Sequence, residues 1–134
     1  MNDGQIKAIL QTSRTIASVG LSPNPERPSL GVAYYLKSQG YRIIPVNPNA
    51  DRVLDEKSYA DLPSVPEKVD VVQIFRRPED VPPIVEQAIQ IGAKVVWMQE
   101  GISNEEAANR AEAAGLQVVM NRCMMQEHRR LFGR

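Results

Sequence analysis

The chain has 134 residues, a length that suits one domain around one hydrophobic core. Its 16 basic and 16 acidic residues cancel, so no overall field attracts nucleic acid or an anionic membrane, and we expect neither as a partner. No apolar run has the length of a signal-peptide core or a membrane span. The one cysteine, Cys123, excludes an internal disulfide bond and suits a reducing compartment. We therefore expect a soluble cytoplasmic protein.

Strands and helices alternate along the whole chain. Short runs of β-branched and other apolar residues predict five strands, and apolar residues at helical spacing predict the helices between them. Glycines or prolines close most of these segments, as they commonly do at helix and strand ends. The predicted order is helix 6–10, strand 15–19, helix 30–36, strand 41–46, strand 69–75, helix 81–91, strand 94–98, helix 104–114, strand 117–120 and helix 123–131.

Local signals add detail to this order. Residues 51–68 show no steady period and carry two prolines, so a loop with at most a short helix is expected there. Ser103 is expected to cap the helix that runs to Ala114, with Glu106 completing a capping box. The alternation predicts one α/β domain over residues 1–134, Rossmann-like and three-layered, with a five-stranded parallel sheet and helices on both faces.

In such a sheet, ligands bind outside the carboxyl ends of the strands, near the point where the strand order reverses. The turn after the first strand contains Gly20, Ser22, Arg27 and Ser29. Glycine permits close approach of a ligand to the backbone, free N–H groups at a helix start favour an anion, and the arginine adds a forked donor. The turn suits a phosphate, and it equally suits an ordinary loop with a solvated arginine.

The next two strand ends carry further candidates. Asn47 and Pro48 stand where a nicotinamide dinucleotide site usually offers an acid. An uncharged asparagine counts against NAD and permits a ligand with a phosphorylated ribose, although the pair taken alone indicates a simple turn. Phe75, Arg76 and Arg77 end the third strand and suit a phosphorylated adenine nucleotide, with the ring for stacking and the guanidinium groups for phosphate.

The later part of the chain offers weaker candidates. Gln99 and Gly101 follow the fourth strand with an amide and a flexible turn, which suit a ligand contact or a plain connection. His128 lies five positions after Cys123 in a helical segment, about 140° away around the axis, so the two make a poor metal pair. We expect a surface histidine, no metal site and no catalytic set.

Six short segments carry a resemblance to a known family: VGLS at 19–22, IPVNP at 44–48, VDVV at 69–72, FR at 75–76, WMQEGI at 97–102 and NRC at 121–123. In this order they closely resemble the small stand-alone CoA-binding proteins, which are similar in turn to the N-terminal domain of the succinyl-CoA synthetase alpha subunit. The resemblance runs from about residue 6 to residue 131. It implies a Rossmann-like fold with coenzyme A (CoA) or an acyl-CoA at the strand-end edge.

The resemblance also implies roles for single positions. The second domain of the synthetase, which supplies its phosphorylated histidine, has no counterpart in this sequence. Arg77 joins the set from its local chemistry and not from the resemblance. By position, Gly20, Ser22, Arg27 and Ser29 would hold phosphates, Asn47 and Pro48 would line the nucleotide site, and Phe75 and Arg76 would border the adenine or a phosphate.

The sequence thus predicts a non-catalytic binding module that serves as a carrier, sensor or regulatory partner. One alternative is an enzyme, either an acyl-CoA-dependent transferase that uses Cys123 or an NAD(P) reductase, and the missing G-x-G-x-x-G pattern and acid weaken the reductase. Another is a nucleotide-binding subunit of a separate ligase, and a protein partner or a homo-oligomer is compatible with all of these. Cys123 is expected to be a buried small residue or to lie near enough to exchange with the CoA thiol.

Overall fold

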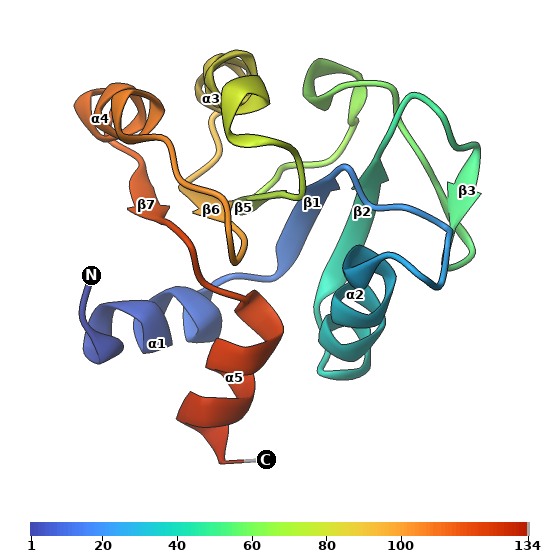
Figure 1. The fold of residues 1–134 in the computed structure, drawn as a ribbon, viewed down its shortest axis with the longest axis horizontal. Helices are drawn as coiled ribbons and strands as arrows, with labels where there is room; N and C mark the ends of the chain where they lie inside the picture. Colours follow the sequence, from blue (N-terminus) through green and yellow to red (C-terminus); the bar gives the residue numbers. More distant parts are fainter. Residues whose placement is uncertain (134) are drawn as a thin grey trace.

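A five-stranded parallel sheet forms the centre of the structure, a computed structural model that describes residues 1–133 (Figure 1). The strand order is β2-β1-β5-β6-β7, so the direction in which strands are added reverses between β1 and β5. All four pairings are parallel, as predicted. The strands are β1 (Thr15–Val19), β2 (Arg42–Val46), β5 (Val71–Ile74), β6 (Val95–Met98) and β7 (Gln117–Val119).

Helices cover both faces of this sheet. In Figure 1, α3 and α4 lie above the sheet and α1, α2 and α5 lie below it. The two hydrophobic clusters divide in the same way, which confirms the Rossmann-like three-layer prediction. The helices are α1 (Asp3–Thr12), α2 (Pro28–Ser38), α3 (Val81–Gln90), α4 (Glu105–Ala113) and α5 (Met124–Phe132).

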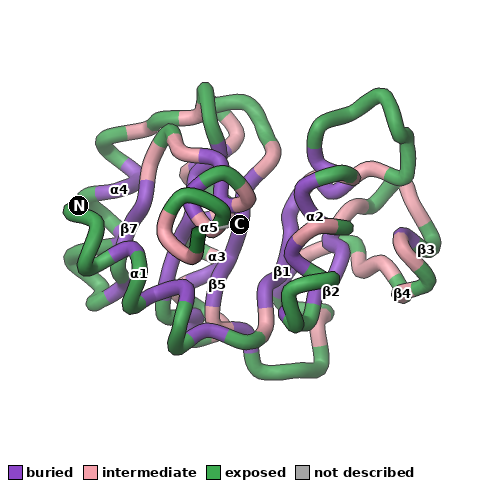
Figure 2. Tube along the Cα trace, turned by 90° about the horizontal axis from the view of Figure 1, so that it is seen from below, coloured by how far each residue is buried: buried purple, intermediate pink, exposed green. Residues whose placement is uncertain are grey.

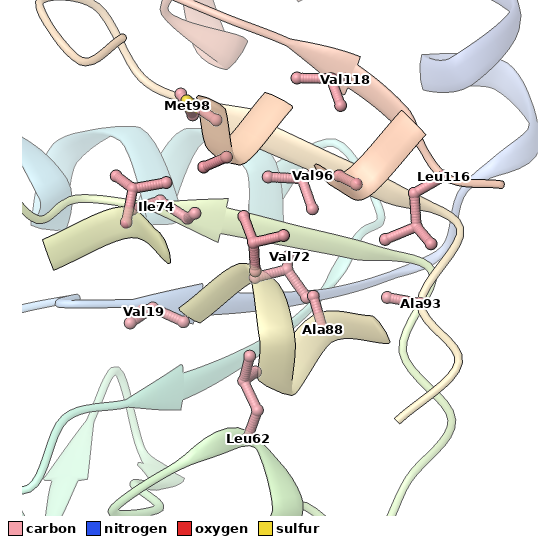
Figure 3. Packing of buried hydrophobic residues seen from close by; sticks show 14 of the residues in the cluster. Val19, Leu62, Val72, Ile74, Ala88, Ala93, Val96, Met98, Leu116 and Val118 are labelled. Carbon is pink, nitrogen blue, oxygen red and sulfur yellow. The ribbon is translucent and has the colours of Figure 1, made fainter. Parts of the chain in front are cut away.

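The core consists of two layers of side chains, one on each face of the sheet. Every residue of β5 and β6 is buried, because parallel strands with helices on both faces have no solvent side. In Figure 2, β5 is drawn as buried and the outer turns as largely exposed. On the α3 and α4 face, Val72 and Val96 of the sheet pack with Ala88 of α3 (Figure 3). On the other face, Trp97 is fully buried, and its Nε1 donates a hydrogen bond of 2.8 Å to the Arg122 carbonyl oxygen.

Residues 51–68 were predicted as a loop with at most a short helix, and the structure differs by adding a hairpin. They contain a small antiparallel hairpin of β3 (Arg52–Val53) and β4 (Glu56–Lys57), followed by a single 3-10 turn at Leu62–Ser64. The hairpin turn places Leu54 and Asp55 at φ of 51° and 63°. Two-residue hairpin turns of this kind usually carry glycine or asparagine, so the sequence holds no recognisable signal for the turn.

The predicted cap of α4 is wrong by one residue. Asn104, and not Ser103, accepts a hydrogen bond of 2.9 Å from the Ala107 N–H. Asn104 also donates a hydrogen bond of 3.0 Å to the Pro78 carbonyl oxygen, and this contact ties the start of α4 to the turn before α3. Asparagine and serine cap helices about equally well, so the tertiary contact decides between them. Within residues 1–133, no helix is long and apolar enough to cross a membrane.

Candidate functional site

The carboxyl ends of the strands carry a cleft of about 860 Å³, which we call the main cleft. Its walls come from the segments that follow β1, β2, β5 and β6, so it spans the point between β1 and β5 where the strand order reverses. All of the predicted site residues except Pro48 and Gly101 line it. They are Gly20, Ser22, Arg27, Ser29, Asn47, Phe75, Arg76, Arg77 and Gln99.

Gly20 follows β1 directly and lies against Phe75, which follows β5. Its φ is 91°, and a Cβ built there would overlap the carbonyl oxygen of Phe75 and touch the side-chain stem of Arg76. Two backbone hydrogen bonds of 2.8 Å fix the position, one from the Gly20 N–H to the Val46 carbonyl and one from the Phe75 N–H to the Val19 carbonyl. Only glycine tolerates both the positive φ and the close contact with Phe75 without strain, so the missing side chain sets the shape of the cleft floor.

The turn after Gly20 is more internally bonded than the sequence suggests. The Ser22 N–H donates a hydrogen bond of 3.1 Å to the Ser29 Oγ and is not free for a ligand. The Asn24 N–H in turn donates to the Ser22 Oγ, also at 3.1 Å. Arg27 is the N-cap residue of α2 but makes no capping bond with its side chain, and Pro28 has no N–H. What remains for an anion in this turn is the Arg27 guanidinium, the Ser29 N–H, the Ser29 hydroxyl proton and the positive end of α2.

The paired arginines share one carboxylate at the cleft wall. The Asp80 Oδ2 lies 3.3 Å from the Arg77 Nε and 3.7 Å from the Arg76 Nη2, and the Glu79 Oε2 lies 3.8 Å from the Arg77 Nη1. The Arg77 side chain is 75% exposed. Exposed ion pairs of this length stabilise a fold very little, so both guanidinium groups are available to an incoming phosphate.

Asn47 both lines the cleft and builds the turn that follows β2. Its Nδ2 donates a hydrogen bond of 3.0 Å to the Leu21 carbonyl, and its Oδ1 accepts one of 2.9 Å from the Asn49 N–H. The side chain therefore ties the β2 end to the β1 turn, a role that needs both a donor and an acceptor. Aspartate offers no donor to Leu21 at neutral pH. The adjacent Pro48 is exposed and lies outside the lining of the cleft.

The end of β6 carries a buried polar cluster. The Gln99 Oε1 accepts hydrogen bonds from the Gln73 Nε2 at 3.1 Å and from the Met124 N–H at 3.0 Å, so it anchors the start of α5 to the central strands. Gly101 lies outside the cleft, and its N–H donates a hydrogen bond of 2.6 Å to the Asn121 Oδ1. Gln73 was not among the predicted site residues, although a lone amide inside an otherwise apolar strand was a visible signal.

Cys123 and His128 take separate places on α5 and just before it. Cys123 is buried, as expected, and it lines the main cleft. His128 is half-buried, not on the surface as predicted: its Nδ1 lies 2.8 Å from the Tyr35 hydroxyl, and its ring packs between Tyr35, Tyr41 and Phe132. Burial holds the pKa of His128 below its ordinary value. In the described chain, no three His, Cys, Asp or Glu side chains are grouped as metal ligands.

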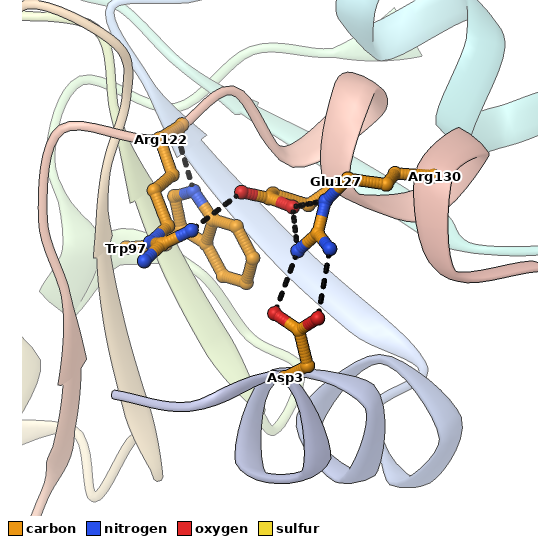
Figure 4. Close-up of polar contacts among 5 residues, drawn as sticks. All are labelled: Asp3, Trp97, Arg122, Glu127 and Arg130. Atoms are coloured by element: carbon orange, nitrogen blue, oxygen red, sulfur yellow. Dashed lines mark hydrogen bonds and ion pairs between the residues drawn. The ribbon is translucent and has the colours of Figure 1, made fainter.

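A network of charged groups, also missed from the sequence, joins α1 to α5 (Figure 4). Arg130 forms hydrogen bonds of 2.9 Å with both carboxylate oxygens of Asp3 and one of 2.8 Å with Glu127. Glu127 accepts another hydrogen bond of 2.9 Å from Arg122. Burial raises the pKa of Glu127, but the bonds from the two arginines outweigh it and hold the pKa below its ordinary value. Glu127 is therefore an ionised carboxylate, neutralised by its neighbours.

The domain has a parallel sheet, and its cleft lies where the strand order reverses. Gly20 forms the floor of this cleft and arginines border it, which is the architecture of a nucleotide-binding domain. The particular family follows from comparison with known proteins. Residues 14–129 match the family described as "CoA binding domain", and the chain belongs to this family. The family expected from the sequence is thereby confirmed.

Relatives of two kinds share this domain. An uncharacterized protein, YneT of Bacillus subtilis, is 40% identical over 124 residues, which are 92% of each chain. The solved structure of a hypothetical protein from Pyrococcus horikoshii OT3 superposes with a TM-score of 0.97 and 47% identity over 99% of this chain and 94% of that one. An ADP-forming acetate–CoA ligase of Archaeoglobus fulgidus is 33% identical over 95 residues, which are 69% of this chain but only 14% of the ligase. The domain therefore occurs in small stand-alone proteins and as a part of much larger ligases.

Proposed function

We propose that the protein binds coenzyme A or an acyl-CoA in the main cleft and acts as a carrier, sensor or regulatory partner and not as a catalyst. The observation that carries the proposal is the convergence, at one switch point, of the glycine floor at Gly20, the open start of α2 and the pair Arg76 and Arg77. Membership in the CoA-binding family supports CoA over other phosphorylated nucleotides.

The distribution of charge favours one direction for the ligand. Arg27, Arg76 and Arg77 border the cleft at the ends of β1 and β5, whereas the β6 end offers the amide of Gln99 and the carboxylate of Glu100. Phosphates would be repelled at the β6 end. The phosphates therefore belong near the arginines and the α2 start, and the uncharged pantetheine arm runs toward β6.

Arginine variants test the proposed site. We expect Arg27→Ala and Arg76→Ala each to weaken CoA binding by about 1–3 kcal/mol, the usual scale for hydrogen bonds to charged groups, while the fold stays intact. Titration calorimetry measures the affinity and circular dichroism the fold. Arg110→Ala is the matched control, because Arg110 is also an exposed arginine in an ion pair, with Glu86, but does not line the cleft. Unchanged affinity in both cleft variants would remove the arginines from the site.

The proposal of a non-catalytic role rests on what surrounds the one nucleophile. Cys123 lines the cleft, but His128 bonds to Tyr35 and lies outside the cleft lining, so it does not serve as a base for the thiol there. We expect no thiol release from acetyl-CoA or succinyl-CoA above the solvent background, measured at single-turnover amounts of protein. Release that disappears in Cys123→Ser would instead identify an acyl-CoA-dependent enzyme.

A second role has a specific observation in its favour. The alignment with an acetate–CoA ligase covers only a small part of that much longer protein, so this chain could supply its nucleotide domain to a separate ligase chain. Affinity purification from the native cell extract without added ligand tests this role. A stoichiometric partner that carries ligase activity would support it, and purification of the chain alone, with CoA bound, would support the stand-alone module.

A further inference from the structure

A second, smaller cavity of about 360 Å³, which we call the side pocket, adjoins the main cleft. Glu100 and Cys123 line both, so the two cavities are neighbours at the β6 end. This is the end toward which the uncharged arm of CoA is directed in the proposed binding mode. The lining residues of the side pocket are Glu100, Met120, Asn121, Arg122, Cys123, Gln126 and Glu127.

The lining of the side pocket is polar. Only Met120 and Cys123 offer apolar surface, and the Gln126 side chain is exposed at the first turn of α5. A guanidinium has five N–H donors, and Arg122 gives one of them to Glu127 in a hydrogen bond of 2.9 Å. An aliphatic chain in this pocket would displace water from charged groups and amides without replacing their hydrogen bonds, which is unfavourable. A group that itself forms hydrogen bonds avoids this penalty.

The charges of the pocket disfavour an anionic occupant. Arg122 and Arg130 are balanced by Glu127 and Asp3 in the network of Figure 4. Glu100 adds a carboxylate at the junction with the main cleft, so the pocket carries an excess of one negative charge. A carboxylate on the ligand would meet this charge at close range, where repulsion between like charges is strongest.

We infer that the side pocket receives the acyl group of a short acyl-CoA, and that it selects an uncharged acyl group with a hydroxyl or amide over an aliphatic or a carboxylate-bearing one. The inference rests on the proposed function, because it needs CoA in the main cleft with its thiol end at β6. It adds the class of acyl group, which the family description does not specify.

Titration calorimetry with four ligands tests the inference: CoA, butyryl-CoA, 3-hydroxybutyryl-CoA and succinyl-CoA. One or two new neutral hydrogen bonds should make 3-hydroxybutyryl-CoA bind about three- to tenfold more tightly than butyryl-CoA. Succinyl-CoA should bind more weakly than 3-hydroxybutyryl-CoA, and Glu100→Gln should raise the affinity for succinyl-CoA relative to that for CoA. Equal affinities for the hydroxylated and the aliphatic ligand would overturn the inference.

A variant of the pocket wall separates this inference from the proposed function. Gln126→Leu should abolish the preference for the hydroxylated ligand and leave the affinity for CoA unchanged, because Gln126 lines the side pocket but not the main cleft. Gln90→Leu, at an exposed position at the end of α3, is the matched control and should keep the preference. A preference that persists in Gln126→Leu would contradict the inference. A wild-type protein that fails to bind CoA would contradict the proposed function, and the inference with it.

Discussion

Replacing Gly20 by alanine tests how closely β1 and β5 approach each other under the cleft. The change has two separate energetic terms. A non-glycine residue at positive φ is strained by about 1–2 kcal/mol. The new Cβ also overlaps the Phe75 carbonyl oxygen, which belongs to the backbone and cannot rotate away, and such overpacking costs about 1–3 kcal/mol more. We therefore expect Gly20→Ala to lower the free energy of unfolding by about 2–5 kcal/mol.

Gly40→Ala isolates the strain from the overlap. Gly40 has a φ of 99°, close to the 91° of Gly20, but no heavy atom lies within 4 Å of its built Cβ. This control should lose only the strain, about 1–2 kcal/mol. Urea unfolding followed by circular dichroism measures both variants at equal pH and salt. If Gly20→Ala is no more destabilised than Gly40→Ala, the inference that the two strand ends approach each other closely is wrong.

Further expectations concern charge at the cleft and in the α1–α5 network. Asp80→Asn should strengthen CoA binding by about 0.5–1 kcal/mol in calorimetry, because it removes the carboxylate that competes for the paired arginines; weaker binding would contradict this. Asn47→Asp should weaken both CoA binding and the fold, each by about 1–2 kcal/mol, since it adds a negative charge and loses the donor to Leu21. Glu127 has a lowered pKa, so its contribution to stability is complete above its unfolded pKa of about 4.3 and is lost as the pH falls through the folded pKa. In urea titrations from pH 7 to about pH 3, the free energy of unfolding should therefore fall less steeply in Glu127→Gln than in the wild-type protein.

The central strands and the position of the site were predictable because they depend on local patterns. The strand 15–19 coincides with β1, since a β-branched run that ends at a glycine carries its own boundaries. The turns that follow these parallel strands all lie at one edge of the sheet, and this brings Asn47, Phe75 and Gln99 into one cleft. Topology alone sufficed for this step, because parallel strands share their carboxyl edge.

What the sequence did not reveal depends on contacts between distant segments. The bond from the Ser22 N–H to the Ser29 Oγ needs the three-dimensional path of the loop, so the turn looked more open than it is. The ion pairs of Asp3 with Arg130 join residues 127 positions apart, and no local sequence pattern predicts them. The half-buried place of His128 likewise follows from the packing of α5 against α2, which brings Tyr35 to its ring.

The most direct test of the proposed function compares the thermal unfolding of the protein with CoA, dephospho-CoA and NAD at equal concentration. A ligand that binds only the folded state stabilises it by about 2.7 kcal/mol at a hundredfold excess over Kd, so the shifts in Tm rank the three affinities. CoA should give the largest shift, and dephospho-CoA, which lacks the ribose phosphate assigned to an arginine, a smaller one. NAD should give little shift, because Asn47 stands where a dinucleotide site offers an acid. A shift with NAD that equals or exceeds the shift with CoA would contradict the proposed function.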